Sequence, residues 1–203
     1  MSPSLEFWFE FGSTYSYLTA MRISAAASAR GVVVSWRPFL LGPIFADQGW
    51  KTSPFNIHKA KGAYMWRDVA RRAKRYGLPF ERLPETGPGA FPQNGLTAAR
   101  IALIGLDEGW GEDFTRAVFH AEFAKSRDIA DADLLARLAK EAGAADNVMD
   151  RALDAANKDR LKNNVDEAFR LGIFGAPSFV VEGEVFWGDD RLEDALDAAT
   201  HTR

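Results

Sequence analysis

The sequence predicts an α/β fold in which a mixed four-stranded sheet is interrupted by a large all-helical insertion. Strand patterns occur only near the two ends of the 203-residue chain, and helical patterns fill the long middle. The predicted order is strand, helix, strand, a helical block, then two strands and a last helix. Two halves of this kind fold together into a thioredoxin-like sheet.

The first unit is a strand, a helix and a second strand. Residues 4 to 11 are rich in aromatic side chains, which favours a strand, and Gly12 ends it. Ser13 is a suitable N-cap for an amphipathic helix that runs to about residue 30. Gly31 stops this helix, and residues 32 to 36 form the next strand. The connection predicts that the two strands are parallel.

The middle of the chain carries helical patterns separated by glycine and proline breakers. We expect helices at about 56–76, 92–109, 112–126, 131–142 and 146–171. Strands return at 178–181 and 185–187 around a short turn that contains Gly183, and a final helix covers about 190–199. The sequence thus predicts a thioredoxin-like domain made of residues 1–42 and 171–203, with a helical insertion domain at 43–170.

Composition narrows the possible functions. The formal net charge is -3, from 25 basic and 28 acidic side chains, so a broad nucleic-acid surface is not expected. We also expect no signal peptide and no membrane span, hence a cytoplasmic protein. The chain contains no cysteine, which excludes disulfide exchange by its own side chains and thiolate metal sites. The three histidines are scattered, and we expect no metal.

The turn at Ser13 is where a thiol redox protein of this fold would carry Cys-x-x-Cys, and this chain has Ser13 and Ser16. In the thioredoxin-like fold, the first helix begins beside a proline that opens the third strand, and Pro177 occupies that position. Whether the Ala176-Pro177 bond is cis stays open. If it is cis, it would present backbone groups of Ala176 to a peptide-like ligand.

Five segments together resemble one family over essentially the whole chain. They are FEFGSTYSYL, WRPFLLGPIF, KGAYMWRDVARRA, FPQNGLTAARIAL and LGIFGAPSFVVEGEVFWGDDRL. In this order and spacing they resemble the 2-hydroxychromene-2-carboxylate isomerases, relatives of kappa-class glutathione transferases and of DsbA-type oxidoreductases. The resemblance implies a thioredoxin-like domain with a helical insert, a homodimer, bound glutathione, and an aromatic carboxylate substrate from naphthalene-type degradation.

The resemblance gives Ser13 the catalytic role of holding the sulfur of glutathione as a thiolate. A free thiol has a pKa near 8.5, and a serine hydroxyl at a helix N-terminus would raise its ionised fraction. The alternative for Ser13 is a plain N-cap, and Ser16 is expected only to pack beneath the ligand. Many members of the family have proline where this chain has Thr14, which could alter the helix entry or add a second hydroxyl near the sulfur.

The resemblance also assigns the remaining contacts. Glutathione is expected to meet Lys61 and the backbone groups of Ala176 and Pro177, and, through its γ-glutamyl end, the segment Gly188, Asp189 and Asp190, with Asp190 preferred. Lys51 and Asn94 are expected near the substrate. Each assignment has an alternative: a solvated surface charge for the lysines, a helix cap for the aspartates and a loop cap for Asn94.

Three functions remain open on these grounds. The first is a glutathione-dependent isomerase that converts 2-hydroxychromene-2-carboxylate to trans-o-hydroxybenzylidenepyruvate. The second is a kappa-like glutathione transferase, or an isomerase acting on another electrophile. The third is a glutathione-binding or peptide-binding module without catalysis, because a peptide can pair with the strand edge beside Pro177.

Overall fold

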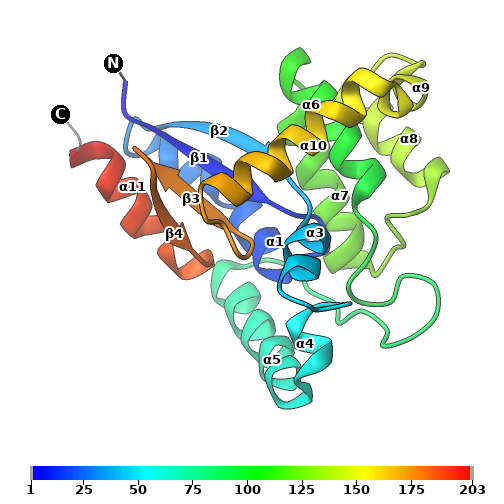
Figure 1. The fold of residues 1–203 in the computed structure, drawn as a ribbon, viewed down its shortest axis with the longest axis horizontal. Coiled ribbons are helices and arrows are strands. Elements are labelled where there is room, and N and C mark those ends of the chain that lie inside the picture. The colour runs from blue at the N-terminus through cyan, green and yellow to red at the C-terminus, as the bar shows by residue number, and fades with distance from the viewer. Residues whose placement is uncertain (1, 202–203) are drawn as a thin grey trace.

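A four-stranded mixed sheet lies at the centre of the computed structural model, which describes residues 2–201. The strands are β1 (Ser4–Phe9), β2 (Val33–Pro38), β3 (Ser178–Val181) and β4 (Glu184–Trp187), in the order β2-β1-β3-β4. As predicted, β1 and β2 are parallel, whereas β3 is antiparallel to both β1 and β4. Strands from the two ends of the chain therefore lie side by side (Figure 1).

The connection between β1 and β2 is two short helices and not the single helix that was predicted. Helix α1 spans Thr14–Ala20 and α2 spans Ile23–Ser28. The break falls at Arg22, whose φ of -129° is not helical. No glycine or proline marks this point in the sequence. Instead, the Arg22 side chain reaches a distant aspartate, described below.

The insertion between β2 and β3 is helical throughout its regular elements. Helix α6 (Leu96–Glu108), α7 (Gly111–Lys125) and α8 (Ala132–Ala142) agree with the prediction to within a few residues. The predicted segment 146–171 is divided into α9 (Val148–Leu153) and α10 (Ala155–Arg170), and 56–76 into α4 (Pro54–Ile57) and α5 (Lys59–Tyr76). Helix α3 (Leu41–Asp47) was not predicted.

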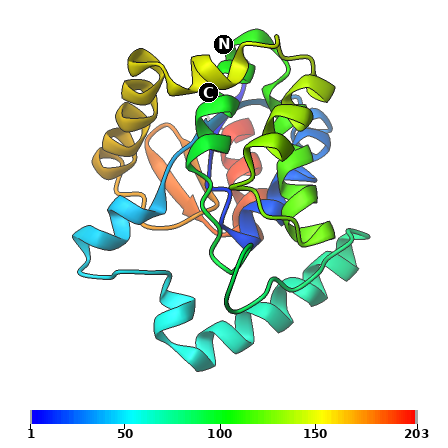
Figure 2. The same cartoon turned by 90° about the vertical axis from the view of Figure 1, so that its right-hand side faces the viewer.

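Both faces of the sheet are covered. Phe7 and Phe9 point into the larger apolar core, while Trp8 between them points into a smaller core with Phe39, and all four are 0% exposed. Helix α10 covers the smaller core through Val165 and Ala168 and neighbouring residues. Figure 2 shows α6 to α9 packed at one side of the sheet, with α4 and α5 along one end of the molecule.

The chain closes with a tight hairpin and a helix. Glu182 and Gly183 link β3 to β4 with φ values of 47° and 89°, the conformation of a two-residue hairpin turn. A short 3-10 helix, η1 (Asp189–Arg191), then leads into α11 (Leu192–His201), which packs its apolar side against the larger core. Among residues 2–201, no helix is both long and apolar enough to span a bilayer.

Candidate active site

Ser13 occupies the sharp turn between β1 and α1 and touches the far end of the chain. Its backbone is extended, with φ -96° and ψ 113°, and its Oγ accepts a hydrogen bond of 3.2 Å from the Ser16 N–H, so it caps α1. The same hydroxyl donates to the carbonyl oxygen of Ala176 at 2.9 Å. The Ala176-Pro177 peptide bond is cis. The predicted meeting of Ser13 with this proline segment is therefore present.

The two other hydroxyls of the turn have different surroundings. Thr14 is buried and donates to the Met65 sulfur of α5 at 3.3 Å, so its hydroxyl is directed into the contact between α1 and α5. Ser16 is 0% exposed, and its Oγ has no hydrogen-bond partner in the described structure. A buried hydroxyl without a partner is costly, and such groups are found at functional sites more often than elsewhere.

Asp189 is buried, and its carboxylate has no capacity left for a ligand. Its Oδ1 accepts from Thr19 at 3.0 Å and from Arg22 Nε at 3.2 Å. Its Oδ2 accepts from Arg72 and Tyr76, both at 3.1 Å. These four bonds give the Asp189 carboxylate a structural role, because it joins α1, α5 and η1 at the start of the last helix. The expected contact of Asp189 with glutathione stays a prediction, which only its backbone can meet.

This aspartate also sets the electrostatics of its neighbours. Burial, together with the Asp189 charge, raises the pKa of Tyr76. Burial by itself would lower the pKa of Arg72, but Asp189, Tyr76 and Asp68 together outweigh it and raise that pKa above the ordinary value. Tyr76 and Arg72 therefore keep their protons at neutral pH, and the cluster holds its charges.

Asp190 is the exposed member of the predicted pair. Its carboxylate accepts from Arg191 at 3.0 Å and lies 3.9 Å from Arg72 Nη2. Gly188 precedes it with φ 113°, and a β-carbon at that position would stand 2.7 Å from Asp190 Oδ1, so only glycine fits. A cavity of about 250 Å³ opens beside this segment on the surface of α5, lined by Asp68, Arg71, Arg72, Arg75 and Tyr76.

The predicted lysines lie on the side of the molecule formed by α4 and α5. Lys61 is exposed on α5, Lys51 is exposed in the segment between α3 and α4, and neither forms an ion pair within residues 2–201. The helix backbone beside Lys61 packs closely on α4, because a β-carbon on Gly62 would stand 2.3 Å from the Phe55 carbonyl oxygen. These ammonium groups are thus free to meet an anion.

Asn94 lies in a loop that packs directly on the Ser13 turn. Its Oδ1 accepts from the Leu96 N–H at 3.0 Å, which is the loop-capping role considered as the alternative. A β-carbon on Gly12 would stand 3.0 Å from the Gln93 carbonyl oxygen, so the turn and the loop are in close contact. The structure therefore brings Ser13, Ala176, Pro177 and the Asn94 loop together.

Sequence reasoning missed two acidic side chains near this turn. Glu10 lies three residues before Ser13, and burial raises its pKa from 4.5 to about 7, against a hydrogen bond from the Gly12 N–H that lowers it. Glu122, on α7, is 0% exposed, and burial, with the charge of Glu10 next, raises its pKa well above the ordinary value. The available signal was spacing, because Glu122 follows Phe119 by three residues and so lies on the apolar face of its helix.

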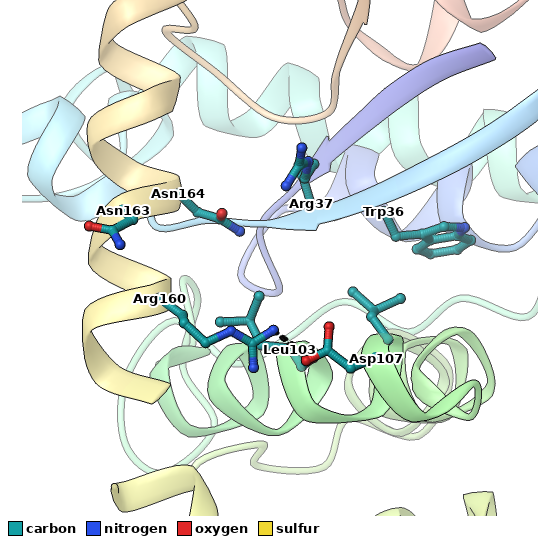
Figure 3. Close-up of a pocket in the computed structure, with 8 residues that line it drawn as sticks. Trp36, Arg37, Leu103, Asp107, Arg160, Asn163 and Asn164 are labelled. Atoms are coloured by element: carbon teal, nitrogen blue, oxygen red, sulfur yellow. Dashed lines mark hydrogen bonds and ion pairs between the residues drawn. The ribbon is translucent and has the colours of Figure 1, made fainter. Parts of the chain in front are cut away.

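A second cavity of about 250 Å³ lies away from the Ser13 turn, between β2, α6 and α10. Figure 3 shows Arg160 and Asp107 facing each other across it, joined by an ion pair of 2.7 Å. Its other lining residues are Trp36, Arg37, Leu103, Leu106, Asn163 and Asn164. None of the predicted site residues lines this cavity.

A family model described as a DsbA-like thioredoxin domain matches residues 4–199. The chain belongs to this family. Its relatives include a protein named 2-hydroxychromene-2-carboxylate isomerase from Sphingobium xenophagum, 28% identical over 196 residues, covering 95% of this chain and 96% of the relative. Glutathione S-transferase kappa 2 from Caenorhabditis elegans is 26% identical over 208 residues, covering 95% and 90%.

A solved structure of 2-hydroxychromene-2-carboxylate isomerase superimposes with a TM-score of 0.83 at 22% identity, covering 96% of this chain and 93% of the other. This confirms the DsbA-like thioredoxin fold with its helical insertion along nearly the full length. The named relatives are isomerases and glutathione transferases, so the family supports an enzyme of the isomerase or transferase type.

Proposed function

We propose that this protein is a glutathione-dependent isomerase that converts 2-hydroxychromene-2-carboxylate to trans-o-hydroxybenzylidenepyruvate. The observation that carries the proposal is the Ser13 hydroxyl held at the Ala176 carbonyl in a chain without cysteine. A thiol site of this fold that has no thiol of its own needs one from a ligand. The relative named as an isomerase of this substrate supports the choice of reaction.

The residues around the turn fit a tripeptide thiol. The Ala176 N–H has no hydrogen-bond partner within the described structure, so it can donate to a ligand carbonyl as a strand edge does. The Ser16 hydroxyl is buried without a partner one helical turn beyond Ser13. A peptide thiol lying over this turn would meet the Ser13 hydroxyl through its sulfur and the Ala176 N–H through its backbone, with Ser16 packed beneath it.

Charged side chains of the required signs lie on α5 and at η1, two elements that pack against α1. Glutathione carries two carboxylates and one ammonium group, and we assign the ammonium to the exposed Asp190 and the glycyl carboxylate to Lys61. Asp189 holds this segment in place through Arg22 and Arg72, and its carboxylate makes no direct contact. We place the substrate carboxylate near Lys51 and Asn94, on the adjoining loops.

Bound glutathione would supply a nucleophilic thiolate that adds to the substrate and is expelled again, so the net reaction is isomerisation. For Ser13 to donate to the sulfur, its O–H must turn away from the Ala176 carbonyl, whereas its lone pair can keep the bond from Ser16 N–H. A charge-assisted hydrogen bond contributes about 1.5–3 kcal/mol, which lowers a thiol pKa by roughly one to two units.

A second candidate is a kappa-like transferase, which the relative named glutathione S-transferase kappa 2 favours. It would use the same thiolate site, but the conjugate would leave as the product. Both candidates are tested by one assay: conversion of 2-hydroxychromene-2-carboxylate with glutathione, without it, and with a general electrophile as the alternative substrate. The proposal expects glutathione-dependent isomerisation with glutathione recovered. Accumulation of a conjugate would favour the transferase, and binding without turnover would favour the non-catalytic module.

We further propose that the protein is cytoplasmic, a compartment in keeping with its lack of cysteine. We also propose that it is a homodimer. Two exposed aromatic side chains, Phe174 at 49% and Trp187 at 53%, pack against each other beside Pro177 and are candidates for such an interface. Light scattering measures the oligomeric state directly, and a molar mass equal to that of one chain would contradict the dimer.

A further inference from the structure

Two carboxyl groups, one just before the Ser13 turn and one on helix α7, have no basic partner among residues 2–201. A β-carbon built on Gly12 would stand 3.1 Å from Glu10 Oε2, and one built on Gly95 would stand 3.2 Å from Glu10 Oε1. The Glu10 carboxylate is thus wedged between the turn that carries Ser13 and the loop that carries Asn94. Side chains larger than hydrogen at positions 12 and 95 would displace it.

Glu122 lies deeper, under the same turn. It is 0% exposed, and neither of its carboxylate oxygens has a hydrogen-bond partner in the described part of the chain. Its helix packs on the turn through Phe119, whose ring is centred 5.0 Å from that of Phe11. The charges that act on Glu122 come from Glu10 and from Asp128, which follows α7, and both are negative.

Two carboxylates placed this way cannot both ionise at low cost. An ion without a partner in a low-dielectric interior takes up a proton instead, and a second acid nearby reinforces this. The deeper group is the one that stays neutral, since it has no hydrogen-bond donor. Glu10 receives a hydrogen bond from the Gly12 N–H and is only partly buried, so it is the group that titrates.

We infer that Glu10 and Glu122 form a proton-holding pair, in which Glu122 stays neutral and Glu10 accepts the proton that a thiol loses when it ionises at Ser13. This rests on the proposed function. In the step, the S–H bond breaks, its electron pair stays on sulfur, and the proton ends on a Glu10 carboxylate oxygen, directly or through water. The net charge of the site as a whole is unchanged, because one negative charge moves from Glu10 to the sulfur.

If the pair accepts the thiol proton, glutathione binding should release fewer protons to the buffer than it would with Ser13 acting alone. At about pH 7.5, roughly one-tenth of a free thiol with pKa 8.5 is ionised, against roughly half to nine-tenths of a bound thiol whose pKa is lowered by one to two units, so binding by itself would release roughly 0.4–0.8 proton. Glu10, with a pKa of about 7, is roughly three-quarters ionised there and can take most of that proton up. Binding should therefore release roughly 0.2 proton or less to the buffer.

The test is calorimetric titration of the full chain with glutathione, in buffers of different ionisation enthalpy, with S-methylglutathione as the ligand that has no thiol proton. Glu10→Gln should raise the release to roughly 0.4–0.8 proton, and Glu122→Gln should leave it at the wild-type value. Equal release from the wild type and Glu10→Gln, with thiolate absorbance present, would overturn the pair. So would a Glu122→Gln variant that behaves like Glu10→Gln.

A ligand-free measurement separates this inference from the proposed function. Carbon NMR of the carboxyl groups should show one side chain, absent in Glu10→Gln, that titrates near pH 7 and another, absent in Glu122→Gln, that stays neutral at that pH. Ordinary titration of both groups near pH 4.5 would overturn the pair whether or not glutathione binds. If no thiolate forms but these titrations appear, the proposed function and the transfer step fail while the neutral Glu122 stands.

Discussion

The Ser13 hydroxyl donates a hydrogen bond of 2.9 Å to the carbonyl oxygen of Ala176, a residue 163 positions further along the chain. This bond joins the first turn of the protein to the segment that opens β3. It also uses the one proton that Ser13 can offer. A ligand sulfur must therefore compete with a backbone carbonyl, and it wins only if it carries negative charge.

Ser16→Ala should leave glutathione-dependent activity within a few-fold of wild type and should not destabilise the protein. The Ser16 Oγ is buried without a partner, so removing it relieves a desolvation penalty of about 1–3 kcal/mol that offsets the small cavity. Urea unfolding and the isomerisation assay measure the two effects. A large loss of activity with normal folding would mean that Ser16 touches the sulfur, contrary to the packing role.

Asp189→Asn should destabilise the fold by about 2–3 kcal/mol. Breaking a fully buried ion pair costs about 3–5 kcal/mol, but Arg22 and Arg72 keep 17% and 27% side-chain exposure and stay partly solvated. Asp190→Asn is the matched control: its side chain is 47% exposed, so stability should change by about 0.5 kcal/mol or less while glutathione affinity falls. Equal effects of the two substitutions on stability would contradict the division of roles.

Lys61→Met should weaken glutathione binding by roughly 10- to 100-fold, the equivalent of a charge-assisted hydrogen bond. Lys59→Met is the control, because Lys59 is also exposed and lies at the start of the same helix. Calorimetry compares the two. If both variants bind as wild type does, the glycyl carboxylate is held elsewhere.

As pH rises, the free energy of unfolding should fall more steeply in the wild type than in Glu122→Gln. A carboxyl group whose pKa is higher in the folded state than in the unfolded state binds more protons when the protein is folded. Its contribution to the free energy of unfolding is therefore fully present below about pH 4.5 and is lost as pH rises through the folded-state pKa. Glu10 completes its loss around pH 7. A Glu122 that stays neutral at that pH, as inferred above, goes on losing its contribution as pH rises further. Above about pH 7 the wild type should therefore keep losing stability while Glu122→Gln levels off. Parallel curves from urea midpoints would show that Glu122 is not a buried neutral acid.

Most of the fold could be predicted from the sequence because its signals are local. The aromatic strand before Gly12, the hairpin at Gly183 and the Asp131 side chain, which caps α8, each act within a few residues. Helix α3 was missed because Gly42 and Pro43 look like breakers. Proline is tolerated in the first turn of a helix, and Leu41 begins this one.

The parts of the site that escaped prediction depend on contacts between distant segments. The break between helices α1 and α2 after Met21 follows from the ion pair between Arg22 and Asp189, which are 167 positions apart. The same ion pair makes the Asp189 carboxylate a buried anchor. The surroundings of Glu10 and Glu122 also arise only after folding, because a turn, a loop and a helix must pack before either carboxyl is desolvated.

The most direct test of the central claim is the ultraviolet absorbance of the glutathione thiolate, followed against pH with the wild type and with Ser13→Ala. We expect the wild type to lower the apparent thiol pKa by roughly one to two units from 8.5. Ser13→Ala, folded but less stable by about 1 kcal/mol through loss of its cap, should return that pKa toward 8.5. An equal shift in both proteins, or no shift in either, would contradict the role of Ser13 as the residue that holds the sulfur ionised.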